Sequence, residues 1–194
     1  MLQTVVKIDR IQNLSDARYC SAMGVEYLGF SIDSNTIDES FLFFKSISEW
    51  VAGVQFVLEV SCFEESIASE PVEIIESTNK EVLSQYMQKG KKTILSIPLL
   101  KAVKSQNHGL YSYIKLTEIE PHMFQDYRDE LIEISRHTEI WVEVTNINSD
   151  QVVDITKIDY IKGITISGGT EPKPGFKDYD ELSEIFEALE DLNE

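Results

Sequence analysis

Short apolar runs alternate with amphipathic segments along the whole of this 194-residue chain. The apolar runs are rich in β-branched and aromatic side chains and therefore predict strands. The predicted strands are residues 4–8, 27–31, 53–60, 72–75, 93–97, 113–116, 139–144 and 163–166. Helical spacing of apolar residues follows each one, over 15–23, 38–51, 63–69, 79–89, 99–103, 122–135, 148–156 and 178–192. The chain therefore repeats a strand–helix unit eight times.

This repetition predicts an α/β fold with a parallel sheet, because each helix returns the chain to the same edge of the sheet. Eight units close a single (β/α)₈ TIM barrel, and we expect residues 1–194 to form one such domain. The chain lies just under the usual lower limit of about 200 residues, so the barrel is of minimal length and some helices must be short. The alternative is an open, doubly wound sheet. It is less favoured because no Gly-x-Gly-x-x-Gly turn follows a predicted strand.

Charge narrows the range of partners. Seventeen Lys and Arg residues stand against 34 Asp and Glu, which gives −17 at neutral pH. We expect no nucleic-acid binding, which needs a cationic face, and no membrane binding, since such a surface repels anionic lipid. The longest apolar runs are also too short to span a membrane. Two cysteines and a first segment unlike a signal peptide predict a reduced, cytoplasmic protein.

Catalytic groups of such a barrel lie at the carboxyl ends of its strands. Asp9 ends the first predicted strand and is the candidate general acid or base. The alternative is a carboxylate that is solvated or paired with neighbouring Lys7 or Arg10. The other candidates by position at predicted strand ends are Arg10, Asp33, Glu76, Thr117, Glu118, Thr145, Asn146, Ser167, Gly168 and Gly169.

The segment Ser167-Gly168-Gly169 predicts a phosphate site after the last strand. Glycines let backbone N–H groups approach an anion closely, and many barrels bind phosphate beside strands seven and eight. A phosphorylated small molecule is thus the expected partner. The alternative is an ordinary glycine turn between a strand and a helix.

No metal and no cofactor are expected. The three histidines, His108, His122 and His137, do not fall at ligand spacing with Cys, Asp or Glu. Trp50 and Trp141 lie on apolar faces of predicted elements, so we expect both in the core. The oligomeric state is not predicted by the sequence.

Segments near both ends resemble the phosphoribosylanthranilate isomerases of tryptophan biosynthesis. Residues 6–17 (VKIDRIQNLSDA) are similar to that family's first strand and helix, typically VKICGIT followed by Asp-Ala. Residues 22–30 (AMGVEYLGF) are similar to its AGAD-x-LGF segment. Residues 166–178 (ISGGTEPKPGFKD) resemble its SSGVE…PGxKD loop. The resemblance implies a (β/α)₈ isomerase fold over the whole chain.

The departures from the family fall on its catalytic positions. The resemblance implies a Cys base where this chain has Asp9, a Gly where it has Arg10, and an Asp acid within 114–117, which reads Ile-Lys-Leu-Thr. The family's substrate-contacting Arg after strand two is absent from Ser-Asn-Thr at 34–36. Its Leu-His-Gly turn after strand four corresponds to Ile-Ile-Glu at 74–76. Its Gly-Gly after strand seven corresponds to Thr145 and Asn146, which would partly replace it beside the remaining Ser167-Gly168 pair.

Three functions follow from this combination. The first is isomerase activity with Asp9 as base, with Glu118 or Glu120 as the only nearby replacement acid. The second is a different reaction on a phosphorylated small molecule. The third is a non-catalytic binding or interaction barrel. Each proton-transfer group is typically worth about 10²–10⁴-fold in rate, and Arg10 would hold Asp9 ionised with a lowered pKa. We therefore expect lost or altered isomerase activity with a residual phosphate site.

Overall fold

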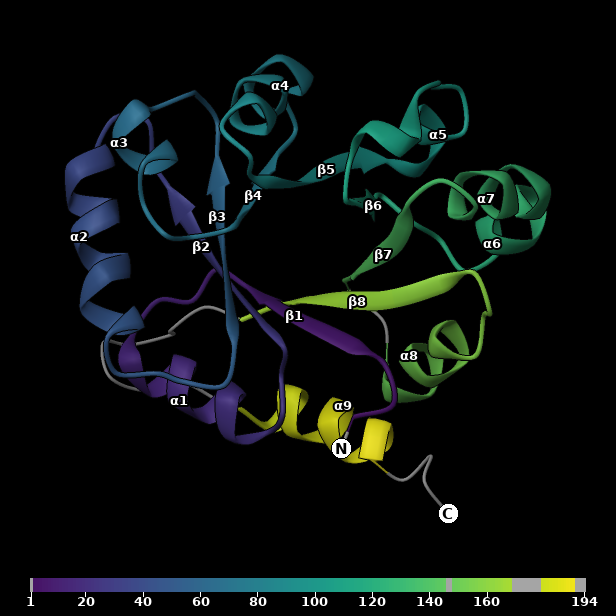
Figure 1. Cartoon of the computed structure of the whole chain (residues 1–194). Coiled ribbons are helices and arrows are strands. Elements are labelled where there is room, and N and C mark those ends of the chain that lie inside the picture. The colour runs from purple at the N-terminus through teal and green to yellow at the C-terminus, as the bar shows by residue number, and fades with distance from the viewer. Residues whose placement is uncertain (1, 146–147, 169–178, 191–194) are drawn as a thin grey trace.

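The computed structural model describes residues 2–145, 148–168 and 179–190, and these form a closed barrel of parallel strands (Figure 1). The strands follow one another round the barrel in chain order, and β1 closes it by pairing with β8. They are β1 Val5–Asp9, β2 Tyr27–Ile32, β3 Gln55–Val60, β4 Ile74–Ser77, β5 Lys92–Pro98, β6 Tyr113–Thr117, β7 Glu139–Val144 and β8 Ile161–Ser167. The predicted (β/α)₈ TIM barrel is confirmed.

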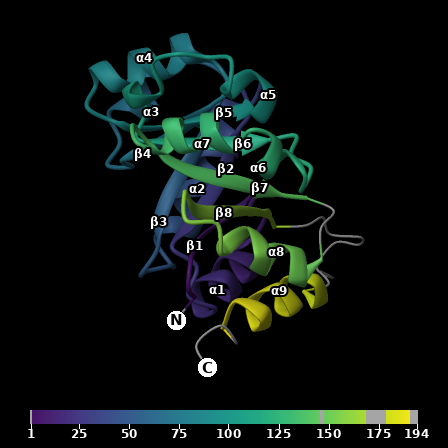
Figure 2. The same cartoon turned by 90° about the vertical axis from the view of Figure 1, so that its right-hand side faces the viewer.

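Helices surround the barrel on its outside (Figures 1 and 2). They are α1 Leu14–Ala22, α2 Ile37–Ser48, α3 Glu65–Ala68, α4 Lys80–Gln88, α5 Leu99–Ala102, α6 Met123–Asp126, α7 Arg128–Ser135, α8 Ser149–Thr156 and α9 Asp180–Glu190, with the 3₁₀ turn η1 at His108–Leu110. The main core lies between these helices and the outward side chains of the strands. The ring closes where Phe186 of α9 approaches Tyr19 of α1, with 6.2 Å between ring centroids.

Local sequence explains where several helices begin. The side chains of Asn13, Asn79 and Asn148 accept hydrogen bonds from backbone N–H groups in the first turns of α1, α4 and α8. Such caps satisfy donors that have no partner within the helix. The short helices expected of a minimal barrel are α3, α5 and α6, each of four residues.

The structure corrects two details of the expected helices. The single helix expected over 122–135 is divided into α6 and α7 by Tyr127, whose backbone leaves the helical region at φ −114° and ψ 26°. The helix expected over 38–51 ends at Ser48, and Trp50 lies beyond it with 66% of its surface exposed. Trp50 is therefore not a core residue, whereas Trp141 is fully buried as predicted.

The interior of the barrel has two different halves. Toward the amino ends of the strands it is apolar, filled by Tyr27, Val57, Ile74, Ile94 and Trp141. The Trp141 ring lies 4.8 Å from Tyr27 and 4.5 Å from Tyr113, centroid to centroid. Toward the carboxyl ends the interior contains buried charged side chains. This second half is where barrels of this kind place their functional groups.

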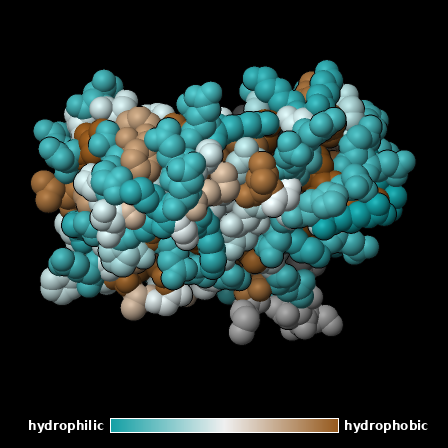
Figure 3. Space-filling model, turned by 45° about the horizontal axis from the view of Figure 1, so that its top comes forward, coloured by the Kyte–Doolittle hydropathy of each residue, from teal (hydrophilic) through white to brown (hydrophobic). Residues whose placement is uncertain are grey.

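The face shown in Figure 3 is mostly hydrophilic, with hydrophobic residues in separate small groups. The large apolar side chains that are most exposed are Leu42, Trp50 and Leu110. Among the described residues, no helix combines the length and the hydrophobicity that a membrane span requires.

Candidate functional site

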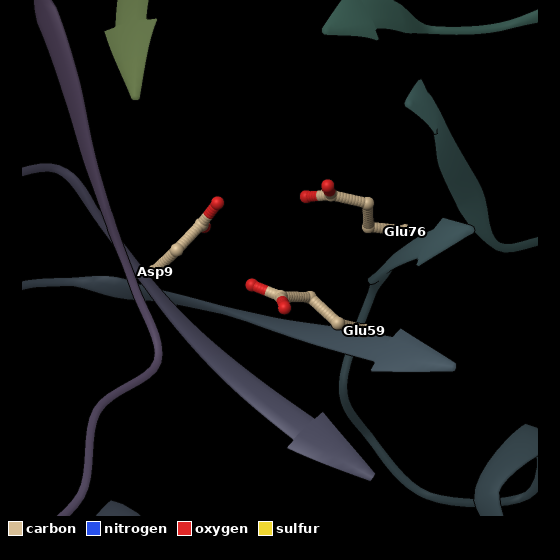
Figure 4. A group of neighbouring side chains, drawn as sticks. All are labelled: Asp9, Glu59 and Glu76. Atoms are coloured by element: carbon tan, nitrogen blue, oxygen red, sulfur yellow. The ribbon is translucent and has the colours of Figure 1, made fainter. Parts of the chain in front are cut away.

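Five charged side chains meet inside the barrel near the carboxyl ends of its strands. Lys7 and Asp9 come from β1, Glu59 from β3, Glu76 from β4 and Lys115 from β6. Figure 4 shows the three carboxyl groups pointing into one common space. Strand geometry explains why these side chains point into the barrel, because alternate residues of a strand point to the same face. Lys7 and Asp9 are two residues apart and both point inward.

The two lysines bind the three carboxylates together. Lys7 Nζ lies 2.5 Å from Glu76 Oε2 and 3.2 Å from Glu59 Oε1, and it also contacts Asp9. Lys115 Nζ donates to Asp9 Oδ2 at 2.9 Å and contacts Glu76. Asp9 and Glu76 thus each bridge both lysines. Four of the five residues are at least 95% buried, and the Glu59 side chain keeps 21% of its surface exposed.

Gly29 of β2 leaves the space that this network fills. A Cβ atom at Gly29 would lie 2.6 Å from Glu59 Oε1 and 2.8 Å from Asp9 Oδ1, both far inside contact distance. Two residues further along β2, the Ser31 hydroxyl donates to Glu59 Oε2 at 3.0 Å. One strand therefore supplies both the room for the charged groups and a hydrogen bond to the carboxylate nearest the solvent.

Asp9 is held as a carboxylate. Burial by itself would raise the pKa of this group, but the adjacent ammonium groups of Lys7 and Lys115 outweigh burial and lower the pKa of Asp9 to about 2. The same contacts act on the lysines. Burial by itself would lower the pKa of both lysines. The charges of Glu76 and Asp9 nevertheless raise the pKa of Lys115. The charges of Glu76, Asp9 and Glu59 raise the pKa of Lys7 well above its ordinary value. The network is therefore a set of mutually stabilised ions.

Glu59 behaves in the opposite way. Burial is the largest cause of a raised pKa, the charges of Asp9 and Glu76 add to it, and Lys7 only partly opposes them. The result is a pKa of Glu59 of about 7. Glu59 is thus the carboxyl group of the network that exchanges a proton near neutral pH, and it is also the most exposed of the five residues.

The three carboxylates also have the spacing of a metal site, since one oxygen of each lies within 4.8 Å of the others. However, Lys7 Nζ contacts all three of them. Its ammonium group supplies the positive charge that a bound cation would otherwise supply. Lys7 and Lys115 together therefore already balance two of the three carboxylate charges.

The structure decides between the two possible cationic partners of Asp9. Its partner Lys7 is confirmed, while the expected role of Arg10 is wrong. Arg10 is exposed and has a positive φ of 58°, which turns the chain away from the direction of β1 directly after Asp9. The cation that joins Lys7 is Lys115, from the opposite side of the barrel.

The predicted phosphate segment is described only in part, because Gly169 and Asn146 lie outside the described residues. Ser167 ends β8 half-buried, and Thr145 follows β7 with its side chain exposed. The Gly168 N–H donates to the Asp9 carbonyl oxygen at 2.8 Å, and a Cβ at Gly168 would lie 2.9 Å from that oxygen. In this conformation Gly168 therefore serves the packing of β8 against β1 rather than offering its N–H to a ligand.

The remaining candidate residues predicted from the sequence lie in different parts of the structure. Glu76 joins the network, and Thr117 and Glu118 lie at the end of β6, where they line a cleft. Asp33 is exposed and accepts a hydrogen bond from the Asn35 N–H at 2.8 Å, so it shapes its own turn. Sequence reasoning missed Glu59 and Lys115. The only signal for them was their alternation with apolar neighbours in Val-Leu-Glu-Val and Tyr-Ile-Lys-Leu, which marks one face of a strand.

Fold and site together define a (β/α)₈ barrel with a charged mouth. Comparison with solved structures shows which known barrels have a similar architecture. Similar folds include the phosphoribosylanthranilate isomerase of Thermotoga maritima (TM-score 0.70, 18% identity) and that of Thermus thermophilus (0.70, 17%). In both cases 97% of this chain covers 100% of the other. The resemblance inferred from the sequence is thereby confirmed for the fold.

The comparisons also limit what the fold implies. No known protein family and no curated protein matches the sequence. An aldolase described as acting on 4-hydroxy-2-oxoglutarate and 2-dehydro-3-deoxyphosphogluconate has the same fold at a TM-score of 0.64 and 14% identity, over 98% of this chain and 93% of its own. At such identities the likeness establishes the architecture, and function must be argued from the site.

Proposed function

We propose that this protein is a phosphoribosylanthranilate-isomerase-like barrel that binds a phosphorylated small molecule at its mouth and does not catalyse the isomerase reaction. The observation that carries the proposal is the environment of Asp9, the residue that the resemblance places at the family's general base. Its two carboxylate oxygens are engaged by Lys7 and Lys115, and its pKa is about 2.

Such a carboxylate is poorly suited to removing a proton from a sugar carbon. A general base works best with a pKa near the operating pH, and Asp9 lies several units below it. Its hydrogen-bonding capacity is also directed to ammonium groups rather than to a substrate. The general acid is missing as well, because β6 carries Lys115 and Thr117 rather than Asp. Removing two such groups costs on the order of 10⁴-fold in rate if they act separately, and less if they act as one unit.

Binding of a phosphorylated molecule is supported by the solved relatives in fold. One phosphoribosylanthranilate isomerase structure (TM-score 0.71, 18% identity) contains a reduced carboxyphenylamino-deoxyribulose 5-phosphate. The present barrel has the same architecture and a polar mouth.

Complementation of a strain that lacks the isomerase, together with an assay of purified protein on phosphoribosylanthranilate, tests the loss of activity. We expect no rescue and no turnover above background. Asp9→Asn defines the background, and Asp9→Cys, which returns the family's thiol, is expected to remain inactive because the acid is still missing. Turnover by the wild type that Asp9→Asn abolishes would contradict the proposal and make Asp9 the replacement base.

A second candidate function rests on Glu59. A carboxyl group with a pKa of about 7, partly exposed at a barrel mouth, is suited to act as general acid and base. This favours a different proton-transfer reaction on a phosphorylated small molecule. In that case the buried ions would hold Glu59 in place and set its pKa, and Ser31 would orient it.

This candidate is tested by screening phosphorylated aldoses and ketoses for exchange of carbon-bound hydrogen with deuterated water. Exchange catalysed by the wild type and lost in Glu59→Gln would support it. Ser31→Ala should lower the rate and shift its pH profile, because the hydroxyl hydrogen bond to Glu59 is lost. Exchange that is unchanged in Glu59→Gln would exclude Glu59 as the acid–base group.

A further inference from the structure

A cleft of about 710 Å³ opens at the carboxyl ends of β4, β5 and β6. This volume lies within the usual range of small-molecule sites. The cleft is bordered by the start of α4 and by α5, and its polar lining includes Lys80, Lys101, Lys104, Ser96, Thr117 and Glu118. The isomerase resemblance assigns no function to this combination, and the buried charged network does not use it.

The charge of the cleft is opposite to that of the protein. Three lysines and one glutamate line it, although the chain as a whole carries −17. Lys101 belongs to α5 and Lys104 follows in the turn after it, and both line the cleft. Lys80 comes from the first position of α4. Within the described ranges 2–145, 148–168 and 179–190, none of these three ammonium groups has a carboxylate partner, whereas Lys45, Lys89 and Lys157 each have one.

The cleft also contains hydroxyl groups that lack protein partners. Ser96 is 9% exposed and lines the cleft from β5, and its hydroxyl has no hydrogen-bond partner in the described part of the chain. The hydroxyl of Thr117, a half-buried residue at the end of the neighbouring strand β6, also has no hydrogen-bond partner among the described residues. Both hydroxyl groups are therefore free to donate a hydrogen bond within the cleft. Ligand oxygen atoms would satisfy both.

From these observations we infer that the cleft binds the phosphate group of a small molecule. Phosphate oxygens accept hydrogen bonds from ammonium and hydroxyl groups, and their charge of about −1.5 to −2 at neutral pH suits three lysines. The inference rests on the proposed function, which supplies the phosphorylated ligand. It assigns the phosphate group to the β4–β6 side of the mouth instead of the β7–β8 side predicted from Ser167 and Gly168.

The test compares two charge-matched triple variants by isothermal titration calorimetry with ribose 5-phosphate, and with ribose as the unphosphorylated control. One variant is Lys80→Gln, Lys101→Gln and Lys104→Gln. The other changes Lys89, Lys92 and Lys157 to Gln, which removes the same charge at exposed sites outside the cleft. Thermal melts of both verify folding, which we expect to be intact because all six side chains are exposed.

We expect the wild type and the second variant to bind ribose 5-phosphate alike, and the cleft variant to bind at least about tenfold more weakly, as the loss of one charge-assisted hydrogen bond would give. Ser96→Ala should weaken binding to a smaller extent, and ribose should not bind. Equal binding by both triple variants, with loss in Ser167→Ala, would overturn the cleft assignment and leave the proposed function standing. Absence of binding to the wild type would overturn both. Tighter binding of citrate than of ribose 5-phosphate would replace phosphate by carboxylate as the ligand group.

Discussion

The two halves of the barrel interior solve the same packing problem with different chemistry. Near the amino ends of the strands, Trp141, Tyr27 and their apolar neighbours fill the space. Near the carboxyl ends, two lysines and three carboxylates fill it. Apolar packing is stable without partners, but each buried ion depends on the others. The charged half is therefore stable only as a complete set, which leaves Asp9 little freedom to act as a base.

The apolar half should show the largest loss of stability on truncation. Trp141→Ala removes a fully buried indole and leaves a cavity, for which about 3 kcal/mol of unfolding free energy is expected. This value lies at the lower end for such truncations. The buried indole N–H has no hydrogen-bond partner among the described residues, and an unpaired buried donor is itself destabilising. Removing the indole also removes that penalty, which offsets part of the loss of packing. Urea unfolding at pH 5 and pH 8 should give the same loss, since no titrating group is involved. A loss that changes strongly with pH would show that the two halves are not independent.

Lys7→Met should give a comparable but pH-dependent loss in the charged half. Without this ammonium group Asp9, Glu59 and Glu76 face one another with only Lys115 to balance them. We expect a loss of at most about 3 kcal/mol of unfolding free energy, the lower end for breaking a buried ion pair, because Lys115 remains. The carboxylates would take up protons to relieve their repulsion, so the deficit should grow as pH rises from 5 to 8. Lys45→Met, at a partly exposed pair with Glu70, should cost about 1 kcal/mol or less. Equal losses of unfolding free energy in Lys7→Met and Lys45→Met would contradict the claim that the buried ions depend on one another.

Glu59→Gln should have a smaller effect whose sign depends on pH. The folded pKa of about 7 exceeds the ordinary 4.5, so the folded protein holds this proton more tightly than the unfolded chain does. Glu59 therefore favours folding below pH 4.5, and this contribution is lost as pH rises through 7. As pH rises from 5 to 8, the unfolding free energy of the variant should therefore increase by on the order of 2 kcal/mol relative to that of the wild type. Glu49→Gln, on the surface, controls for the loss of one charge, and a flat difference for Glu59→Gln would disprove the raised pKa.

Trp50→Ser should have the smallest effect. With 66% of its surface exposed, this side chain contributes little packing, and a change within about 0.5 kcal/mol is expected by thermal or urea unfolding. The pair of tryptophans therefore separates a core position from a surface position. A loss above about 2 kcal/mol would mean that Trp50 is covered in solution.

The sequence predicted the architecture because strand–helix alternation and apolar periodicity are local signals. Eight apolar runs became eight strands, and the short run at 113–116 pairs with both neighbours as β6. Trp50 shows the limit of such signals. It continues the helical spacing of Phe41, Phe44 and Ile47, but α2 has already ended at Ser48, so the periodicity no longer fixes its direction.

The charged site was predictable only in part. Lys7 and Asp9 share one strand, so their pairing follows from a separation of two residues. The contact between Asp9 and Lys115 joins positions 106 residues apart, and it depends on how the strands are staggered around the closed barrel. A local sequence pattern does not determine how far neighbouring strands are shifted relative to one another. Glu59 could not be recognised either, because its raised pKa arises from burial beside two other carboxyl groups.

The most direct test of the central claim is the ¹³C NMR titration of the side-chain carboxyl groups in the wild-type protein between pH 4 and pH 8. If Asp9 is held ionised by Lys7 and Lys115, its carboxyl carbon should show no protonation step in this range, in keeping with a pKa of about 2, while Glu59 should titrate with a midpoint near 7. A protonation midpoint of Asp9 within the range would contradict the claim, because Asp9 would then be free to accept a proton as the isomerase base must.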